Sequence, residues 1–441
     1  MQRFFLLKGN KNSCIIGANF ILSQSLTSFK GKPFMNILIL NHYAGSIDLG
    51  MEYRPFYLAK EWEKNNHKAT IIAGTYSHIR TKNPEIEGKY SITKVDGIQY
   101  FWIKTPRYSA NGLKRFFSML VFTFRIYSLT KVILKNNKYD AVIASSTYPL
   151  DIFPARYISK KCHAKLVYEV HDLWPLSPME LGGLSKWNPF IMLMQYAENF
   201  AYKKSDKVIS LLPFTLSHML AHGLKKEKWN YIPNGIDLNQ WENFKNIPDN
   251  VMIKLNEIKK TFSKIVAYTG TFGLANALDS LLDASKLVND MQVAFVLFGK
   301  GPLTSHLKER IEKENLENVF LFEPVPKNSI PHLLSLFDIL YIGLQNQPLF
   351  RFGISPNKLI DYMMSAKPLI LAIKAGNDMV TEADCGVTIE PEDPNAISDA
   401  IRKIVSMSPE DIKRLGENGK RYILRYHTFQ YLASKFIEAI K

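Results

Sequence analysis

The stretch Gly353-Ile-Ser-Pro-Asn-Lys-Leu-Ile-Asp-Tyr-Met-Met-Ser-Ala-Lys-Pro368 decides the fold of this chain. Proline suits the first turn of a helix, where its missing N–H loses no partner, so Ser355-Pro356 predicts a helix start. Such a helix points its free N–H groups into the preceding loop and forms an anion site. Lys358 adds a cation, and Asp361, on roughly the same face, accepts hydrogen bonds from hydroxyls. A short apolar run comes next, so the helix leads into a buried strand. The anion site and the carboxylate of Asp361 together predict a ligand that carries both phosphates and hydroxyls.

Strands that alternate with helices run along most of the chain. Short apolar runs typical of buried parallel strands lie at 36–41, 68–74, 97–104, 140–145, 165–170, 207–211 and 229–232, and again at 265–268, 293–298, 319–322 and 339–344. The polar stretch 239–263, rich in Asn and Lys, separates the two sets and predicts a linker. This alternation is typical of doubly wound parallel sheets. We therefore expect an α/β fold of two Rossmann-like domains that face each other across a ligand-binding cleft.

The domain boundaries follow from the same pattern. Residues 1–34 hold five basic and no acidic residues and precede the first apolar run, so we expect a disordered extension or a start-site artefact rather than a poor signal peptide. Residues 35–238 form the first domain and 239–425 the second. Residues 426–441 form a C-terminal helix that packs back toward the first domain.

Composition narrows the class of partner. The net charge of +16 favours contact with phosphates, in nucleic acid, anionic lipid or a phosphorylated substrate. No nucleic-acid recognition motif accompanies this charge, so nucleic acid is not the expected partner. The three widely spaced cysteines predict neither a disulfide framework nor a zinc site, and they fit a reducing, cytoplasmic compartment. No segment reaches the roughly 20 apolar residues that a membrane-spanning helix needs.

Residues 103–138 hold eight basic and no acidic residues, and their middle, 116–129, is apolar and aromatic. A helix of this composition over 113–138 lies in a lipid interface and would place the protein at an anionic membrane surface. A buried crossover helix with charged ends explains the same pattern equally well.

Pro233-Asn-Gly-Ile-Asp237 follows a strand between the two halves, and Asn-Gly alone predicts a turn with positive φ. Together with 353–368, this segment resembles the GT-B glycosyltransferases of family 4. The resemblance runs across nearly the whole chain after Met35. It includes His42-Tyr-Ala-Gly45, Gly50-Met-Glu-Tyr-Arg54, Glu169-Val-His-Asp-Leu-Trp-Pro175, Tyr268-Thr-Gly-Thr-Phe-Gly273 and Phe298-Gly-Lys-Gly-Pro302. The segments 170–175 and 356–359 are similar to the fucosamine transferase branch, which works on bacterial surface polysaccharides.

The resemblance implies a retaining, metal-independent transferase without a cofactor. Its donor is a nucleotide-diphosphate sugar, by default a UDP-linked N-acetylated hexose or deoxyhexose, and its acceptor is a lipid-linked glycan or oligosaccharide. The product belongs to O-antigen, capsule or exopolysaccharide synthesis at the inner face of the plasma membrane. A catalytically silent scaffold protein of a glycan assembly complex, or a sugar-nucleotide epimerase, would share this architecture. A dehydrogenase is not expected, since no strand is followed by Gly-x-Gly-x-x-Gly.

The resemblance also assigns the donor site to the second domain. Glycines before a helix N-terminus permit close backbone approach to a diphosphate. In the family an arginine and a lysine usually follow the first glycine, but this chain has Thr271 and Asn276, so neutralisation rests on helix dipoles and Lys358. The implied nucleotide-sugar-binding residues are Gly270, Thr271, Gly273, Asn276, Gly299, Gly301, Ser355, Asn357, Lys358, Leu359 and Asp361.

Family members usually carry two glutamates with seven residues between them, and here these positions are Gly353 and Asp361. Asp361 is expected to bind the ribose hydroxyls. Loss of the first acid implies a different donor sugar, a substitute such as Arg351 or Asn357, or weakened activity.

On the acceptor side, His171 and Asp172 end a strand, where open α/β sheets bind ligands. By resemblance His171 orients the acceptor hydroxyl or balances charge at the transition state, and is catalytic together with Lys358 and Asp361. A structural role explains Asp172 equally well. The other acceptor-side candidates are Gly45, Gly50, Glu52 and Arg54.

Overall fold

A computed structural model describes residues 34–109, 112–135 and 137–441. The chain divides into a short unit, Met1–Met35, and a compact unit, Asn36–Lys441, which holds both sheets of the fold. The extension predicted for residues 1–34 lies outside the described residues, apart from Phe34.

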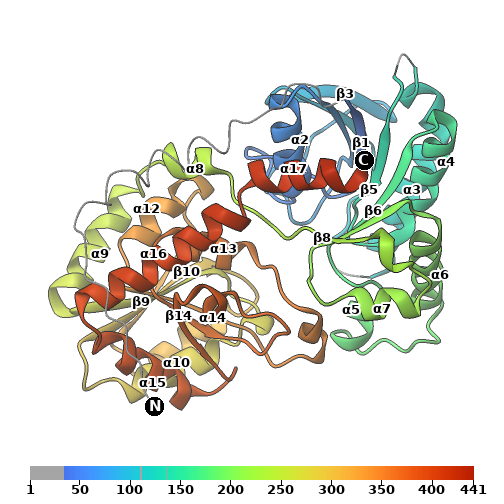
Figure 1. Cartoon of the computed structure of the whole chain (residues 1–441). Coiled ribbons are helices and arrows are strands. Elements are labelled where there is room, and N and C mark those ends of the chain that lie inside the picture. The colour runs from blue at the N-terminus through green and yellow to red at the C-terminus, as the bar shows by residue number, and fades with distance from the viewer. Residues whose placement is uncertain (1–33, 110–111, 136) are drawn as a thin grey trace, which may run out of the picture. The chain divides into compact units, whose positions relative to one another are not determined.

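The first half of the compact unit is built on an eight-stranded sheet (Figure 1). Its strand order is β3-β4-β2-β1-β5-β6-β7-β8, and all neighbours pair in parallel except the β3–β4 hairpin. The strands are β1 (Asn36–Leu40), β2 (Lys68–Gly74), β3 (Tyr90–Val95), β4 (Ile98–Ile103), β5 (Ala141–Ala144), β6 (Lys165–Val170), β7 (Lys207–Ser210) and β8 (Trp229–Tyr231). The helices are α2 (Arg54–Lys64), α3 (Leu113–Ile133), α4 (Ile152–Cys162), α5 (Leu176–Glu180), α6 (Pro189–Lys204) and α7 (Leu216–Ala221).

The second half repeats this alternation with a six-stranded, wholly parallel sheet in the order β11-β10-β9-β12-β13-β14. The strands are β9 (Lys264–Thr271), β10 (Val293–Lys300), β11 (Val319–Phe322), β12 (Ile339–Gly343), β13 (Leu369–Ala372) and β14 (Gly386–Ile389). The helices are α8 (Leu238–Glu242), α9 (Asp249–Thr261), α10 (Leu278–Leu287), α11 (Thr304–Lys313), α12 (Ile330–Ser335), α13 (Asn357–Met364), α14 (Met379–Ala383), α15 (Pro394–Val405), α16 (Pro409–Tyr426) and α17 (Phe429–Ile440). The predicted α/β fold with two doubly wound sheets is confirmed.

The strand order of each sheet reverses at one point, between β1 and β5 in the first and between β9 and β12 in the second. Parallel sheets bind ligands in the crevice outside the carboxyl ends of the strands at such a reversal. The topology therefore directs attention to four loops, which come after β1, β5, β9 and β12.

The stretch 239–263, predicted to be a linker, is instead mostly helical. Asp237 caps α8 by accepting a hydrogen bond from the Asn239 N–H at 3.2 Å, and α9 follows after a short loop. Helix α9 buries Leu255 and Ile258 in the core while its Asn and Lys side chains remain outside. The sequence composition did not indicate helix α9, because only one narrow face of this helix is apolar.

The prediction that no segment is long and apolar enough to span a membrane is wrong for helix α3. By length and composition alone, this helix of 21 residues meets that requirement, because a window of 18 residues within it has a mean hydropathy of 1.4. The helix nevertheless buries one face, including Phe122 and Ile126, in the core of the first sheet, as core helices of soluble proteins also do. Its other face leaves Leu113 and Phe124 exposed at 85% and 67%.

The chain crosses between the two halves twice, and the two crossings are hydrogen-bonded to each other. The Ile236 N–H donates to the carbonyl of His427 at 2.8 Å, and the Phe429 N–H donates to the carbonyl of Ile236 at 3.0 Å. Gly235 lacks the positive φ that the Asn-Gly pair predicted. Glycine is needed there for space, since a Cβ would lie 2.5 Å from Leu432 Cδ1 and 2.7 Å from the His427 carbonyl oxygen. Beyond the second crossing, α17 lies against α2 (Figure 1).

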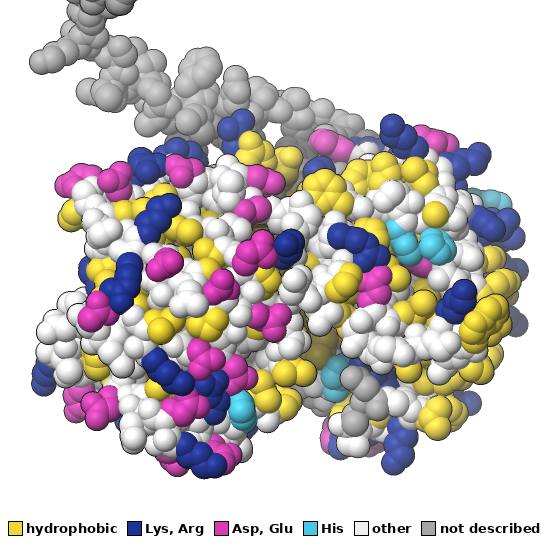
Figure 2. Space-filling view, turned by 90° about the horizontal axis from the view of Figure 1, so that it is seen from below, with side chains coloured by type: hydrophobic (Ala, Val, Ile, Leu, Met, Phe, Trp, Pro, Cys, Tyr) yellow, Lys and Arg dark blue, Asp and Glu magenta, His cyan; other side chains and the backbone are white. Residues whose placement is uncertain are grey.

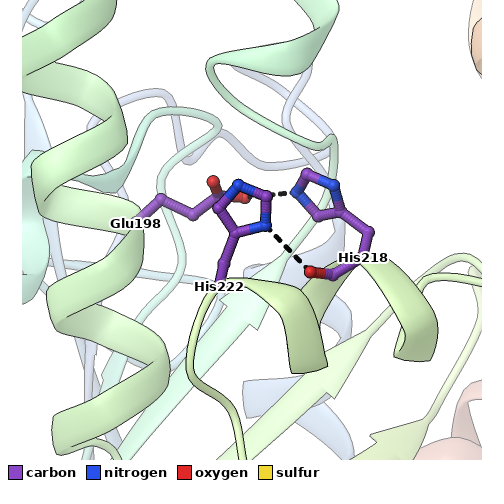
Figure 3. Close-up of side chains that lie close together, drawn as sticks. All are labelled: Glu198, His218 and His222. Carbon is purple, nitrogen blue, oxygen red and sulfur yellow. Dashed lines mark hydrogen bonds and ion pairs between the residues drawn. The ribbon is translucent and has the colours of Figure 1, made fainter.

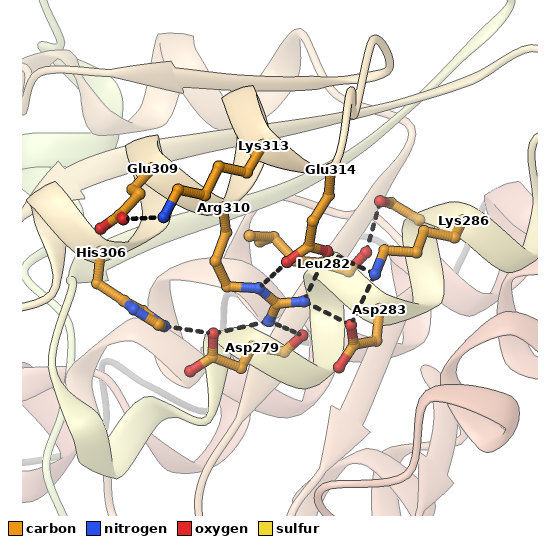
Figure 4. A network of polar contacts seen from close by, with 10 residues as sticks. Asp279, Leu282, Asp283, Lys286, His306, Glu309, Arg310, Lys313 and Glu314 are labelled. Carbon is orange, nitrogen blue, oxygen red and sulfur yellow. Dashed lines mark hydrogen bonds and ion pairs between the residues drawn. The ribbon is translucent and has the colours of Figure 1, made fainter.

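A network of ion pairs joins α10 to α11 on the second domain (Figure 4). Arg310 donates to Asp279 Oδ1 at 2.8 Å, to Asp283 Oδ1 at 2.6 Å and to Glu314 Oε1 at 2.6 Å. Helix α10 follows the loop after β9, so this network fixes one end of a candidate ligand-binding loop.

Candidate active site

A cleft of about 280 Å³ is lined by residues of both halves. The first half contributes Glu52, His171 and Asp172, and the second contributes residues 353–356, which immediately precede α13. These residues come from the loops after β1, β6 and β12. The loops after β1 and β12 stand at the two strand reversals, and the loop after β6 lies one strand further along the first sheet. Its volume is just below the range of about 300–1,000 Å³ usual for small-ligand pockets.

His171 is held by a buried network at the end of β6. Its Nε2 lies 3.0 Å from Ser145 Oγ and 3.3 Å from Glu169 Oε2, and only 11% of its side chain is exposed. Ser145 Oγ donates to Glu169 Oε2 at 2.6 Å. The imidazole therefore has a fixed orientation at the wall of the cleft.

Arg54 completes this network from the first turn of α2. Its Nε donates to Glu169 Oε1 at 2.9 Å and its Nη2 to the carbonyl of Ile232 at 3.0 Å. With 2% exposure, Arg54 is a buried positioning residue that ties His171, through Glu169, to the first crossing between the halves. Arg54, which the sequence suggested as an acceptor-side residue, is absent from the lining of the 280 Å³ cleft but lines a cavity of about 30 Å³ together with Glu52.

The charges in this network reinforce one another. Burial raises the pKa of Glu169, but the positive charges of Arg54 and His171 outweigh it and bring the pKa to about 2. Burial lowers the pKa of His171, but the hydrogen bond and charge of Glu169 outweigh it, so the pKa of His171 is raised. The imidazole is thereby biased toward its protonated form, which can donate a proton or stabilise negative charge.

The loop after β1 folds back on itself to bring Glu52 to the cleft. The Gly45 N–H donates to the carbonyl of Glu52 at 2.8 Å, and a Cβ on Gly45 would lie 1.9 Å from the carbonyl oxygen of Gly50. Gly45 and Gly50 therefore shape the loop after β1, while Glu52 and the exposed Asp172 are the carboxylates that line the cleft.

Lys358 lies in the first turn of α13 and points at the loop after β9. Its Nζ donates to Tyr268 Oη at 2.9 Å and to Asn276 Oδ1 at 2.8 Å. Asn276 Nδ2 donates in turn to the Thr271 carbonyl at 3.0 Å. Gly270 adopts φ +149° there, and a Cβ on it would lie 2.9 Å from Lys358 Nζ. Glycine thus lets the ammonium approach the loop backbone.

This arrangement suits a phosphate. Burial lowers the pKa of Lys358 from 10.5 to about 8. Tyr268 and Asn276, which accept hydrogen bonds from the ammonium, are neutral, and among the described residues no carboxylate forms an ion pair with Lys358. The N-terminus of α13, which has no side-chain cap, opens beside Lys358. Ammonium and helix N-terminus together favour an anionic ligand.

Asp361 lies one turn further along α13. Its Oδ2 lies 3.3 Å from the ammonium of Lys327, which comes from the loop after β11. Burial lowers the pKa of Lys327, but the charge of Asp361 outweighs it and raises the pKa. Both residues line a cavity of about 30 Å³ together with Asn357 and Glu52. Lys327 was missed by sequence reasoning, although its place just after a strand end was a usable signal.

The position of the absent first acid has a structural explanation. Gly353 adopts φ +98°, and a Cβ on it would lie 2.5 Å from Pro213 Cδ, so a glutamate does not fit this backbone. Of the two suggested substitutes, Arg351 is engaged in a bidentate pair with Glu180 at 2.7 and 2.8 Å and does not line the cleft. Asn357 lies beside Asp361.

The remaining predicted donor-site residues lie in different surroundings. Ser355 lines the cleft and accepts a hydrogen bond on Oγ from the Asn234 N–H at 3.0 Å. Leu359 is 1% exposed and packs in the core, so its side chain is not available to a ligand. Gly299 and Gly301 pack against backbone atoms of Gly270 and of Phe272, where a Cβ would clash. A Cβ on Gly273 would make only ordinary van der Waals contacts.

A second, larger hollow of about 810 Å³ adjoins the cleft, because the two share Asp172 and Ser177. Its lining is mostly apolar and includes Leu113, Phe116, Met119, Trp174, Leu181, Leu184 and Phe190. Arg115 adds a cation. We call this hollow the apolar groove. In Figure 2, hydrophobic side chains also gather along the right margin of the surface.

The two-sheet fold, the cleft between its halves and the partly buried Lys358 are consistent with a GT-B glycosyltransferase. Residues 50–240 match the model of Glycosyltransferase Family 4, and residues 263–407 match that of Glycosyl transferases group 1, so the two matches cover most of the chain. The chain belongs to the family 4 glycosyltransferases of GT-B fold, which confirms the expected enzyme class.

The chain is similar to two curated proteins. It is 22% identical over 352 residues to the probable glycosyltransferase WbjE of Pseudomonas aeruginosa, covering 77% of this chain and 83% of that protein. It is 19% identical over 254 residues to the putative colanic acid biosynthesis glycosyl transferase WcaI of Escherichia coli, covering 56% and 62%.

Three solved structures share the fold. Sucrose-phosphate synthase of Thermosynechococcus elongatus has a TM-score of 0.67 at 16% identity, covering 92% of this chain and 98% of that chain. HepE of Anabaena in complex with UDP-glucose has a TM-score of 0.62 at 14% identity, with coverages of 92% and 98%. WaaG, a glycosyltransferase involved in lipopolysaccharide biosynthesis, has a TM-score of 0.63 at 15% identity, with coverages of 92% and 100%.

Proposed function

We propose that this protein transfers a sugar, with retention, from a nucleoside-diphosphate donor to a lipid-linked or oligosaccharide acceptor in bacterial surface polysaccharide synthesis. The main support for this proposal is Lys358 at the start of α13. This lysine lies partly buried beside the loop after β9 and has no carboxylate partner among the described residues. The printed descriptions of WcaI and WaaG, which name colanic acid and lipopolysaccharide biosynthesis, support the pathway, and the UDP-glucose complex of HepE supports the donor class. By resemblance the sugar is an N-acetylated hexose or deoxyhexose.

The donor's diphosphate would bind Lys358 and the N-terminus of α13, with its ribose hydroxyls toward Asp361. The sugar would then extend into the cleft toward His171. In the reaction the bond between the anomeric carbon and the phosphate oxygen breaks, and the acceptor oxygen bonds to that carbon from the same face. The acceptor proton passes to the departing phosphate oxygen. Stabilising the charge on this leaving group is the largest contribution expected of the protein.

The apolar groove supports the lipid-linked acceptor. It joins the cleft at Asp172 and Ser177, so a hydrocarbon chain lying in the groove would hold its head group near His171. Arg115 in the groove suits the phosphate of such a head group. Together with the exposed face of α3, this favours a peripheral position at the inner face of the plasma membrane. The proposed reaction uses no metal, because Lys358 and the helix N-terminus take the place of one at the diphosphate.

Nucleotide binding tests the proposal first. We expect UDP to raise the melting temperature of the purified protein, and GDP and ADP serve to identify the base. Asp361→Ala is the control, since it removes the hydroxyl acceptor while leaving Lys358 in place. A shift that persists in Asp361→Ala would place the nucleotide elsewhere, and no shift with any of the three would contradict a donor site.

One observation favours a second candidate function, that of a catalytically silent scaffold in a glycan assembly complex. Gly353 stands where the family has an acid, and its backbone and neighbours leave no room for one. This candidate predicts a folded protein that neither hydrolyses nor transfers any nucleotide sugar. Turnover of a single donor, measured by release of the nucleotide, would exclude it.

A further inference from the structure

A cluster of three metal-ligating side chains lies in the first domain, on elements that do not line the cleft. Glu198 comes from α6, His218 from α7, and His222 from the residue that caps the end of α7 (Figure 3). The two histidines are four residues apart, so both rings project from the same side of the helix. Their ring centroids are 4.2 Å apart, and Figure 3 shows both rings beside the carboxylate of Glu198.

We propose that Glu198, His218 and His222 bind a divalent transition-metal ion of the zinc class. One ligand atom from each residue lies within 4.8 Å of the others, so a small displacement would bring all three to a single ion. Two imidazole nitrogens and one carboxylate oxygen are the donor set that zinc uses in sites with an open fourth position. The same set excludes calcium and magnesium, which prefer oxygen ligands alone.

The charge on Glu198 supports a cation at this place. Its side chain is 1% exposed, and among the described residues its only ion pair is with His218 Nε2, at 3.1 Å. A positive charge nearby stabilises a buried carboxylate. A divalent ion between the carboxylate and the two rings would supply that charge.

The surroundings of the cluster orient its ligands. Tyr202 Oη donates to Glu198 Oε1 at 2.8 Å, and Gln195 Nε2 donates to Glu198 Oε2 at 2.7 Å. His222 Nδ1 lies 2.9 Å from the carbonyl oxygen of His218 and donates to it, which leaves Nε2 of His222 as the acceptor that can bind a metal. Hydrogen bonds of this kind to the outer atoms of ligands are typical of metal sites.

An ion can reach the cluster from solvent. His218 lines a surface hollow of about 670 Å³ together with Phe214, Ser217, Arg351, Phe352 and Gly376. The fourth position of a tetrahedral ion would face this hollow and take a water molecule. Three of the residues that line the hollow belong to the second domain, and the His218 ring lies 5.7 Å from the ring of Phe352. Metal binding would therefore fix α6 to α7 next to the contact between the domains.

The test is zinc binding by the full-length protein, measured by titration calorimetry after dialysis against a chelator. We expect one zinc ion per chain and a melting temperature that rises with zinc concentration, because a ligand of the folded state stabilises it. Cobalt(II) gives a second readout, since tetrahedral coordination by nitrogen and oxygen produces strong visible absorption. His222→Gln should weaken zinc affinity at least tenfold without changing the fold, as judged by circular dichroism.

The matched control is His306→Gln, which removes an exposed histidine that also pairs with a carboxylate, 2.8 Å from Asp279. This control should bind zinc as the wild-type protein does. Absence of saturable zinc or cobalt binding to the folded wild type would overturn the proposal. Equal zinc affinity of His222→Gln and wild type would overturn it as well, since the ion would then lie elsewhere. Neither result depends on the transferase activity.

Discussion

Replacing Lys358 with methionine removes the ammonium while keeping the length and apolar stem of the side chain. In the free enzyme the ammonium donates to two neutral groups, Tyr268 Oη and Asn276 Oδ1. Each such hydrogen bond contributes about 0.5–1.5 kcal/mol net, and burial of the charge opposes this, so the stability of the variant should change little. Catalysis should change far more, because the partner of the ammonium during the reaction is a departing diphosphate.

The size of the catalytic effect follows from charge and distance. Two unit charges about 4 Å apart interact by about 4 kcal/mol at the effective dielectric constant of about 20 that suits partly buried pairs. Loss of one preorganised donor from a developing oxyanion lowers kcat by about 10²–10³-fold, which agrees with that figure. We therefore expect Lys358→Met to lower kcat by two to three orders of magnitude at saturating donor. Asp361→Asn should mainly raise the KM for the donor.

The assay is steady-state release of nucleoside diphosphate, with the fold of each variant checked by its melting temperature. A pH profile adds a second readout, because the pKa of Lys358 is about 8 in the free enzyme. The ammonium form binds the diphosphate, so kcat/KM should fall as pH rises through about 8, and Lys358→Met should lack this limb. A variant kcat close to that of the wild type would refute the role of Lys358.

Three further outcomes are expected. Glu169→Gln leaves Arg54 buried without its charge partner and should lower the free energy of unfolding by about 3–5 kcal/mol in denaturant titrations at pH 7. Since the pKa of Glu169 is lowered from 4.5 to about 2, that stabilisation is complete above pH 4.5, and the difference between variant and wild type should shrink as pH falls toward 2. Gly235→Ala places a Cβ 2.5 Å from Leu432 and should cost about 1–3 kcal/mol in the same titration; an unchanged midpoint would contradict the close approach. Leu181→Asp should raise the KM for a lipid-linked acceptor at least tenfold and leave the KM for the donor unchanged. The control Leu424→Asp, on the exposed face of α16, should change neither KM. Equal effects of the two substitutions would contradict lipid binding in the apolar groove.

Much of the fold was predictable because buried parallel strands leave continuous apolar runs, such as the one that became β1. Strand β3 escaped prediction since most of its residues are exposed and it pairs only at the sheet edge. Helix α9 escaped because most of its surface is polar. In both cases the local composition resembled that of a loop, and tertiary pairing decided the structure.

In the candidate site, too, some residues could be predicted from the local sequence and others depend on tertiary structure. Positions that a motif carries, such as Asp361 and His171, could be named from the sequence, because strand ends and helix starts are visible there. Their partners could not, because Lys327 and Ser145 reach them only through the folding of distant loops. Leu359 was named for its place in a motif, but helical periodicity turns its side chain into the core.

The C-terminal helix has a consequence for dissecting the enzyme into parts. Trp62 Nε1 on α2 donates to the carbonyl of Ala433 on α17 at 3.1 Å, and α17 buries Leu432, Phe436 and Ile440. The last residues of the chain therefore complete the first domain, although the whole second domain separates them from it in sequence. An expression fragment that ends near residue 238 would expose the apolar face of α2. A stable acceptor domain requires α17 to be joined to it by a short linker in place of the second domain.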